Sequence, residues 1–259
     1  MTTSGGHRPQ GRSGALRGGT LADAVVSALA ACARAVDRLL DAGGVAPPRL
    51  TLPDEVLGEL RALFGDTVDL SAVVIRRGHV PGVPHRRAFA LPGLIYLGPD
   101  PGIVATAGGA GSGASSGAST HAGDLCPRAT PTLVHELVHL WQGRVIGPRY
   151  VLHALVEQVR RGRRAYDWRA ALGLVPPAPG APPLVAFDTD CNPDLTSDIS
   201  PEPLGFEAHA QLVSEAYARR VGLAGTRAHG GRDEELRAME AALTRLRAGD
   251  GQPGTGARV

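Results

Sequence analysis

The segment Thr132-Leu-Val-His-Glu-Leu-Val-His-Leu-Trp-Gln142 constrains the fold of this chain most, because its residue spacing is typical of a helix that binds a metal. An α-helix has 3.6 residues per turn, so His135 and His139 lie one above the other on one face. Thr130 is a suitable N-cap and Pro131 suits the first helical position, so we expect the helix to begin just before the motif. Two imidazoles placed in this way can bind one ion.

Glu136 follows the first histidine and flanks the same face. Many zinc hydrolases use this spacing, because Zn²⁺ lowers the pKa of its bound water to about 7 and the adjacent carboxylate accepts the proton. The alternative is a solvated helix face that carries the pattern by chance. The other residues of the segment are mostly apolar, and three ionisable side chains in a buried helix are costly without a metal. We therefore predict Zn²⁺ bound by His135 and His139, with Glu136 as general base.

The third zinc ligand is not part of the motif. A catalytic zinc normally has three protein ligands, and one peptidase family places the third, a histidine, where this chain has Val145. We therefore expect a carboxylate from a later element, and Glu207 is favoured because it stands near the start of a helix. An acidic residue there also simply stabilises the helix dipole. The alternatives that remain open are Glu215, Glu202, Asp167, Asp190 and Asp198.

Length and charge favour one catalytic domain. The chain has 259 residues, 43% of them hydrophobic, and a net charge of +2 with its arginines scattered among acidic residues. Nothing here favours a nucleic-acid surface, so we expect a peptide or protein substrate and no nucleic-acid partner. The three cysteines show no Cys-x-x-Cys pairing, which argues against a disulfide framework, although Cys126 and Cys191 could pair in an oxidising compartment.

The domain is predicted to span residues 20–247. Residues 1–19 and 248–259 are expected to be disordered ends, because they carry few apolar side chains. Within the domain, 107–123 is made almost wholly of Gly, Ala and Ser and is expected to be a flexible insertion, and 173–203 is a Pro-rich loop.

The N-terminal segment admits two interpretations. Leu29-Ala-Ala-Cys32 resembles a lipoprotein cleavage box after a short apolar region. The apolar spacing nevertheless continues past Cys32 with a helical period, which favours an amphipathic helix over Thr20 to Asp41. No apolar run is long enough for a transmembrane segment. We expect a cytoplasmic protein, or one secreted by a non-classical route, rather than export through a signal peptide or a lipid anchor.

The remaining elements predict an α+β fold in which a small sheet packs on the metal-binding helix and further helices follow. Strands are expected at Val68–Arg77 and Ala88–Leu97, which are β-branched or bounded by turn residues. The expected helices besides the metal-binding one are Leu52–Phe64, Tyr150–Arg164, Leu204–Val221 and Arg232–Arg247. A short turn is expected at Tyr166–Leu172.

The chain resembles a bacterial zincin-like metallopeptidase domain of the gluzincin type, associated with extracellular contractile injection systems and Vgr-related secreted proteins. The resemblance covers roughly residues 50–220 and is specific at the metal-binding helix. The segments that carry it are Leu52-Pro-Asp with Phe64-Gly65, Val73–Arg76, Arg87-Ala-Phe with Ile95-Tyr-Leu97, Leu133–Gln142, Ala165-Tyr-Asp-Trp168 and Glu207-Ala-His-Ala210. The chain departs from the pattern at Ala208 and His209, where the family has glutamines, and in the 107–123 insertion, which puts substrate geometry in doubt.

The resemblance implies a zincin-like fold, Glu207 as the third zinc ligand and an association with a secretion system. We expect a zinc-dependent metallopeptidase that hydrolyses peptide bonds. The stabiliser of the transition state is sought among Tyr166, Tyr217 and His209, although its helical position turns His209 away from the metal. The alternatives are a zincin-like structural or loading module with little turnover, and a secreted protease toxin.

Overall fold

The computed structural model has helices around two small sheets, which makes the chain an α+β protein as predicted. The residues that the structure describes are 21–82, 87–107, 125–175, 204–223 and 233–248. The predicted disordered ends, nearly all of the 107–123 insertion and most of the Pro-rich loop lie outside these ranges.

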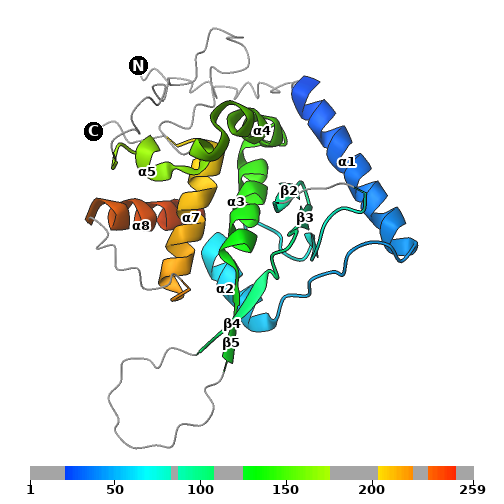
Figure 1. Cartoon of the computed structure of the whole chain (residues 1–259), viewed down its shortest axis with the longest axis horizontal. Coiled ribbons are helices and arrows are strands. Elements are labelled where there is room, and N and C mark those ends of the chain that lie inside the picture. Colours follow the sequence, from blue (N-terminus) through cyan, green and yellow to red (C-terminus); the bar gives the residue numbers. More distant parts are fainter. Residues whose placement is uncertain (1–20, 83–86, 108–124, 176–203, 224–232, 249–259) are drawn as a thin grey trace, which may run out of the picture.

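Two helices run side by side through the centre of the molecule, α3 (Pro131–Ile146) and α7 (Phe206–Arg220) (Figure 1). Helix α8 (Asp233–Ala248) packs on α7, and α2 (Asp54–Phe64) packs on α8. Apolar side chains from these four helices fill the main core, and the fully buried ones include Leu60, Leu137, Val138, Val213 and Leu246. The core therefore fixes α3 against α7, the two helices predicted to carry metal ligands.

A three-stranded sheet lies against α3. Its order is β1 (Val74–Arg76), β3 (Leu94–Tyr96), β2 (Phe89–Leu91), with β1 parallel and β2 antiparallel to β3. The predicted strand at Ala88–Leu97 is thus two strands, because Gly93 adopts a φ of 78° and reverses the chain.

The strand predicted at Val68–Arg77 is shorter than expected. Only Val74–Arg76 forms the strand β1, because the preceding residues form a turn in which the backbone N–H of Ser71 donates to Asp69 Oδ1 at 3.1 Å.

A second, two-stranded sheet was not predicted. Strands β4 (Ile103–Ala107) and β5 (Leu125–Ala129) form an antiparallel hairpin that leads directly into α3. Neither strand was predicted, because Pro127 in β5 and the run of small residues beside β4 have low β-strand propensity. A two-stranded ribbon tolerates proline, because one side of each strand has no partner to receive a hydrogen bond.

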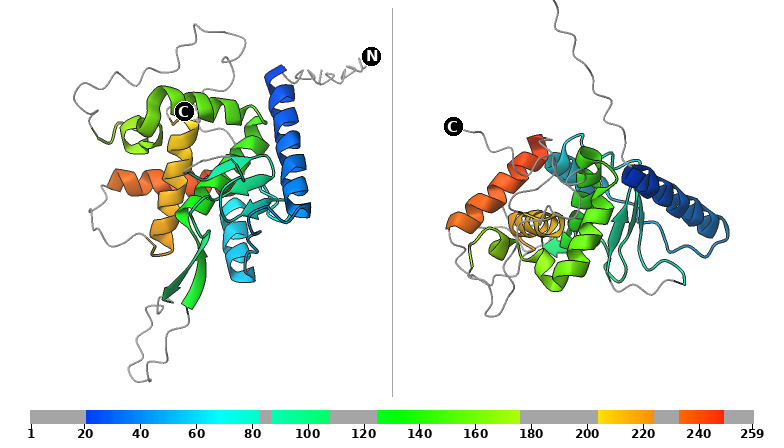
Figure 2. Two further views of the ribbon diagram at one scale, coloured as in Figure 1. Left: turned by 45° about the vertical axis from the view of Figure 1, so that its right-hand side comes forward. Right: turned by 90° about the horizontal axis from the view of Figure 1, so that it is seen from above.

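Helix α1 (Leu21–Ala42) lies on the far side of the sheet from α3 (Figure 2). It forms as predicted, but its stripe of large apolar residues does not face the core. Leu21, Leu29 and Leu39 are 82%, 63% and 73% exposed, whereas Val26 and Ala30 are buried. Polar contacts hold the helix instead, among them a 2.6 Å hydrogen bond from Arg34 Nη1 to the carbonyl of Pro92. No helix in the described ranges is long and apolar enough to cross a bilayer.

Helix α4 (Tyr150–Arg161) crosses the ends of α3 and α7. It ends three residues earlier than predicted, because Gly162 takes a φ of 55° and the chain continues as the 3₁₀ helix η1 (Gly162–Tyr166). The short helix α5 (Trp168–Ala171) occupies the predicted turn. Together α4 and η1 cover one side of the α3–α7 pair.

Candidate metal centre

Helix α3 begins where the sequence predicted. Thr130 is its N-cap and accepts a hydrogen bond from the backbone N–H of Leu133 at 3.1 Å, and Pro131 occupies the first turn. The rings of His135 and His139 lie next to one another, with centroids 4.9 Å apart. The helical spacing therefore places both imidazoles on the face that looks toward α7.

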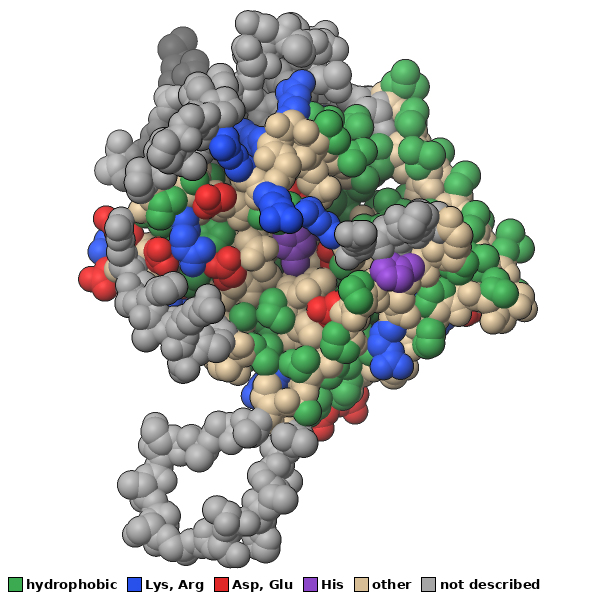
Figure 3. All heavy atoms as spheres, viewed as in Figure 1, with side chains coloured by type: hydrophobic (Ala, Val, Ile, Leu, Met, Phe, Trp, Pro, Cys, Tyr) green, Lys and Arg blue, Asp and Glu red, His purple; other side chains and the backbone are tan. Residues whose placement is uncertain are grey.

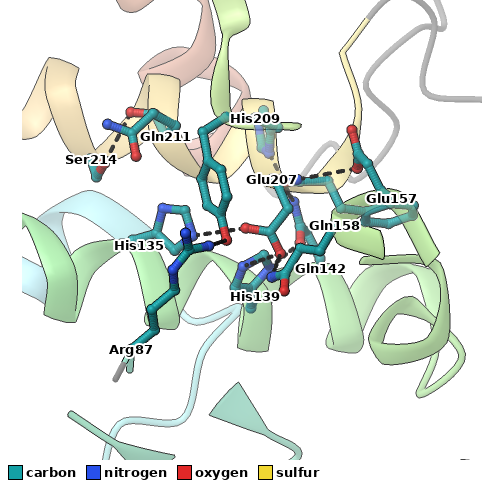
Figure 4. A network of polar contacts seen from close by, with 12 residues as sticks. Arg87, His135, His139, Gln142, Glu157, Gln158, Glu207, His209, Gln211 and Ser214 are labelled. Atoms are coloured by element: carbon teal, nitrogen blue, oxygen red, sulfur yellow. Dashed lines mark hydrogen bonds and ion pairs between the residues drawn. The ribbon is translucent and has the colours of Figure 1, made fainter. Parts of the chain in front are cut away.

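Glu207, in the first turn of α7, completes a cluster with the two histidines (Figure 4). Its Oε2 lies 3.3 Å from His135 Nε2, and its Oε1 lies 3.4 Å from His139 Nε2. The Glu207 side chain is 1% exposed, and one ligand atom from each of the three residues lies within 4.8 Å of the others. These three residues form a group that could hold a metal ion.

The rival carboxylates occupy other places. Glu215, two turns further along α7, accepts a hydrogen bond from Trp168 Nε1 at 3.1 Å and pairs with Arg169 at 3.0 Å. Asp167 caps α5 by accepting a hydrogen bond from the N–H of Ala170. Glu202, Asp190 and Asp198 lie outside the described residues. Among the residues that the structure describes, Glu207 is the carboxylate that joins the two histidines.

Two glutamines form hydrogen bonds with members of the cluster. His139 Nδ1 lies 2.8 Å from Gln142 Oε1, and Gln142 Nε2 donates to the carbonyl of Phe206 at 3.0 Å. If Nδ1 carries the proton, Nε2 of His139 presents its lone pair toward Glu207, as a metal ligand must. Gln158, on α4, donates to Glu207 Oε1 at 2.7 Å. Each glutamine thus orients one member of the cluster.

The cluster holds more negative charge than its own partners balance. Burial raises the pKa of Glu136 to about 7, the nearby His139 opposes this and Glu207 adds to it. Burial alone would raise the pKa of Glu207, but hydrogen bonds from His135 and His139 outweigh it and lower that pKa. Burial would likewise lower the pKa of His139, but Glu207 outweighs it and raises that pKa to about 9. Without a metal, the proton on His139 supplies the counter-charge of Glu207.

Glu136 has an unusual environment. Its side chain is buried, and Oε2 has no hydrogen-bond partner among the described residues. A buried carboxylate oxygen without a partner is unfavourable unless a ligand, ion or water completes it. The sequence predicted this residue beside the metal, and the structure places it on the wall of a cavity.

Two adjoining cavities meet at the cluster, with volumes of about 690 Å³ and 480 Å³. Both are lined by Arg87, Ala88, His135, Glu136 and Tyr166. The larger continues toward Gln211 and Ser214 on α7, and the smaller toward His139, Glu207 and the apolar side of α4. Histidine and arginine side chains meet near the centre of this face (Figure 3). A molecule longer than a single side chain can therefore extend to both sides of the histidines.

The three residues predicted as possible transition-state stabilisers lie in different places. Tyr166 lines both cavities, and its ring stacks on His135 at 5.8 Å between centroids. His209 is buried behind Gln142 and against Trp141, and lines neither cavity. Tyr217 donates its hydroxyl to Glu59 Oε2 at 3.0 Å and lies in the core, several turns from Glu207. Of the three, Tyr166 lines both cavities, and His209 and Tyr217 line neither.

Several residues around the cluster had no role predicted from the sequence. Arg87 Nη1 donates to the Tyr166 hydroxyl at 3.2 Å, which adds a cation to the shared wall of the cavities. The Tyr150 ring stacks on His139 at 6.2 Å, and it fits there because a Cβ at position 143 would lie 2.6 Å from that ring. Arg87 belongs to a segment that carries the family resemblance but was assigned no role, and Tyr150 belongs to no motif. The sequence shows a glycine at position 143, but only the packing of α4 on α3 explains why no side chain fits there.

Comparison with known proteins gives no family for this chain. No protein-family model, no curated protein and no solved structure matches it.

Proposed function

We propose that this chain is a zinc-dependent metallopeptidase with a zincin-like fold. The observation that carries the proposal is the convergence of His135, His139 and Glu207 on one point, with Glu136 beside them on the wall of an open cavity. Two imidazoles and one carboxylate with an open side are the donor set of many catalytic zinc sites. The small sheet packed on the metal-binding helix fits the same architecture.

The residues present suit a zinc ion. Nε2 of both histidines and both oxygens of Glu207 face one another, and Gln142 and Gln158 orient them from outside the cluster. When bound, zinc would supply a Lewis acid that polarises the peptide carbonyl and lowers the pKa of the attacking water.

Glu136 is the general base in this proposal. Its unpartnered Oε2 is available to accept the proton of the attacking water and to pass it to the leaving amine. Its raised pKa of about 7 suits a group that must both accept and release a proton near neutral pH. Within the described residues, Glu136 forms no hydrogen bond with the three proposed zinc ligands. A substitution at Glu136 should therefore remove the base and leave the metal site in place.

Tyr166 and Arg87 stand where negative charge develops on the substrate. The Tyr166 hydroxyl accepts a hydrogen bond from Arg87 and donates its own proton to Glu207, so that proton would become available to a substrate oxygen once zinc engages the Glu207 carboxylate. Burial raises the pKa of Tyr166 to about 12, so the hydroxyl stays protonated at neutral pH. The two cavities on either side of the cluster would accommodate the residues that flank the cleaved bond.

The substitution Glu136→Gln tests this function against a metal-binding module without turnover. We expect zinc content near one ion per chain in both proteins, and a fall in the rate of peptide cleavage of about 10²–10⁴-fold in the variant. Cleavage is measured with unstructured protein and quenched peptide substrates, and zinc by elemental analysis. Glu215→Gln is the matched control, since it changes a carboxylate on α7 that faces Trp168 rather than the cluster.

Two outcomes would contradict the proposal. Wild-type protein that takes up no zinc would refute the metal site. Stoichiometric zinc with equal, negligible cleavage in the wild type and Glu136→Gln would refute the enzyme and leave a structural zinc module.

A further inference from the structure

The helix that carries Glu207 starts without a cap of its own. The first four N–H groups of an α-helix have no partner within the helix, and a Ser, Thr, Asp or Asn side chain at the N-cap usually accepts one of them. The N-cap of α7 is Gly205, which has no side chain to do so. The start of α7 is nevertheless buried from Leu204 onward, so these N–H groups need partners from another element.

Glu157 on α4 provides that partner. Its Oε2 accepts a hydrogen bond from the backbone N–H of Glu207 at 3.4 Å, and its carboxylate also accepts from the N–H of Phe206 (Figure 4). The Glu157 side chain is 0% exposed, and Arg161, one turn further along α4, lies 3.3 Å from its Oε1. A carboxylate at the positive end of a helix dipole is favourable, which compensates part of the cost of burying it.

Gly205 makes room for this carboxylate. A Cβ at position 205 would lie 1.7 Å from Glu157 Oε1 and 2.3 Å from its Cδ. The φ of Gly205 is −65°, a value open to any residue, so it is the close approach of Glu157 that requires glycine here. An alanine would displace the end of a flexible side chain, which leaves the fold intact but removes the carboxylate from the helix start.

Gln158, the next residue on α4, holds the other end of the ligand. Its Nε2 donates to Glu207 Oε1 at 2.7 Å. We infer that Glu157 and Gln158 are positioning residues that fix Glu207 from one helix, Glu157 through the backbone and Gln158 through the carboxylate, with Gly205 admitting the first contact. This inference rests on the proposed zinc site, because it assigns to α4 the task of presenting the third ligand.

Zinc affinity separates positioning from a merely structural contact. Zn²⁺ binding is measured by competition with a chromogenic chelator for wild type, Glu157→Ala, Gln158→Ala and Gly205→Ala. We expect each variant to bind Zn²⁺ about 10–100-fold more weakly, the usual effect of removing a group that orients a metal ligand. Glu215→Gln, on the same helix but facing away from the cluster, should lower thermal stability and leave the affinity unchanged.

A double substitution tests the role of Gly205. Glu157→Ala and Gly205→Ala remove the same contact, so the double variant should bind Zn²⁺ about as tightly as either single variant. The visible absorption spectrum of the Co²⁺-loaded proteins gives a second readout, because it reports the ligand geometry directly. Glu157→Gln, which keeps an acceptor oxygen, should restore part of the lost affinity.

The inference and the proposed function fail in different ways. Wild type without zinc, or Glu207→Ala with full zinc affinity, would refute the proposed site itself. Tight zinc in the wild type, its loss in Glu207→Ala, and wild-type affinity in both Glu157→Ala and Gln158→Ala would overturn only the positioning role. Additive losses from Glu157→Ala and Gly205→Ala would show that Gly205 does not act through Glu157.

Discussion

Two clusters of charged side chains within the described residues have buried members, and they differ in how completely their atoms are paired. In the first, Arg76 on β1 is 1% exposed and uses all three of its nitrogens. Nε and Nη2 contact the two oxygens of Asp37 at 3.0 Å and 2.9 Å, and Nη1 contacts Asp41 at 2.7 Å and the Pro47 carbonyl at 3.1 Å. The Tyr96 hydroxyl completes Asp37 at 2.7 Å. This cluster joins α1 to the sheet and leaves nothing for a ligand.

The cluster of α3 and α7 is the opposite case. Glu136 keeps an unpartnered oxygen within the described residues, and of the two imidazoles beside Glu207, burial lowers the pKa of His135 whereas Glu207 raises that of His139. It also borders cavities, whereas the Arg76 cluster lines neither of the two described above. Burial of charge alone therefore does not identify a site that could bind a ligand. The unpartnered oxygen of Glu136 and the adjoining cavities do.

The largest expected effect comes from breaking the complete cluster. Arg76→Met should lower the free energy of unfolding by about 3–5 kcal/mol, because it leaves Asp37 buried without its counter-charge. Denaturant unfolding of the variant measures this. The double variant Arg76→Met with Asp37→Leu should recover much of the loss, since it removes both charges. A single variant as stable as the wild type would mean that water, rather than Arg76, satisfies Asp37.

Breaking the incomplete cluster should have a different signature. His139→Ala should weaken zinc binding by more than about 100-fold, which corresponds to about 2.7 kcal/mol, because it removes one of three ligands. Its metal-free stability should change less than that of Arg76→Met. Chelator competition and unfolding without metal test the two statements. Equal zinc affinity in His139→Ala and wild type would exclude His139 as a ligand.

Zinc itself distinguishes the two clusters. At a free zinc concentration about ten times the Kd, the folded wild type should gain about 1.4 kcal/mol of stability. Arg76→Met should gain the same increment, because its cluster shares no partner with the metal ligands. His139→Ala should gain almost none. Thermal unfolding with and without zinc measures all three, and a reduced gain in Arg76→Met would indicate that the two clusters are coupled.

Features that depend on the residues of a single helix could be predicted from the sequence. The spacing of His135 and His139 and the N-cap Thr130 predicted the start of α3 and the face that carries both imidazoles, and the structure confirms both. Glu207 was predicted because a later carboxylate was needed, because it stands near the start of a helix, and because the family resemblance implies it. Nothing in the spacing selects it over Glu215, and only the packing of α7 on α3 and η1 decides which turn faces the histidines.

Contacts between helices were beyond prediction. Glu157 and Gln158 lie on a helix whose sequence shows only an amphipathic pattern, and Arg87 adjoins a strand that was itself misjudged. The orientation of helix α1 was mispredicted for a related reason. Its apolar period indicated a core-facing stripe, but the ion pairs of Asp37 and Asp41 with Arg76 orient it with Leu29 and Leu39 outward. The ion pairs with Arg76 therefore determine which face of α1 packs on the sheet. The apolar periodicity alone predicted the opposite face.

The smallest expected effect is the acid response of the complete cluster. Burial tends to raise the pKa of Asp37, but hydrogen bonds from Arg76 and Tyr96 outweigh it and hold that pKa below its ordinary value of 3.8. A carboxyl with a lowered folded-state pKa stabilises the fold above its unfolded pKa, and this contribution is lost as the pH falls through the folded value. The stability difference between wild type and Asp37→Asn should therefore be constant from pH 7 to about 5 and shrink below about pH 4. Denaturant unfolding of both proteins across this range gives the difference directly, and other carboxyls cancel because both proteins contain them. A difference that stays constant down to pH 3 would mean that the folded-state pKa of Asp37 equals its unfolded value, and one that grows as the pH falls below about 6 would mean that this pKa is raised, with Arg76 too weak a partner to offset burial.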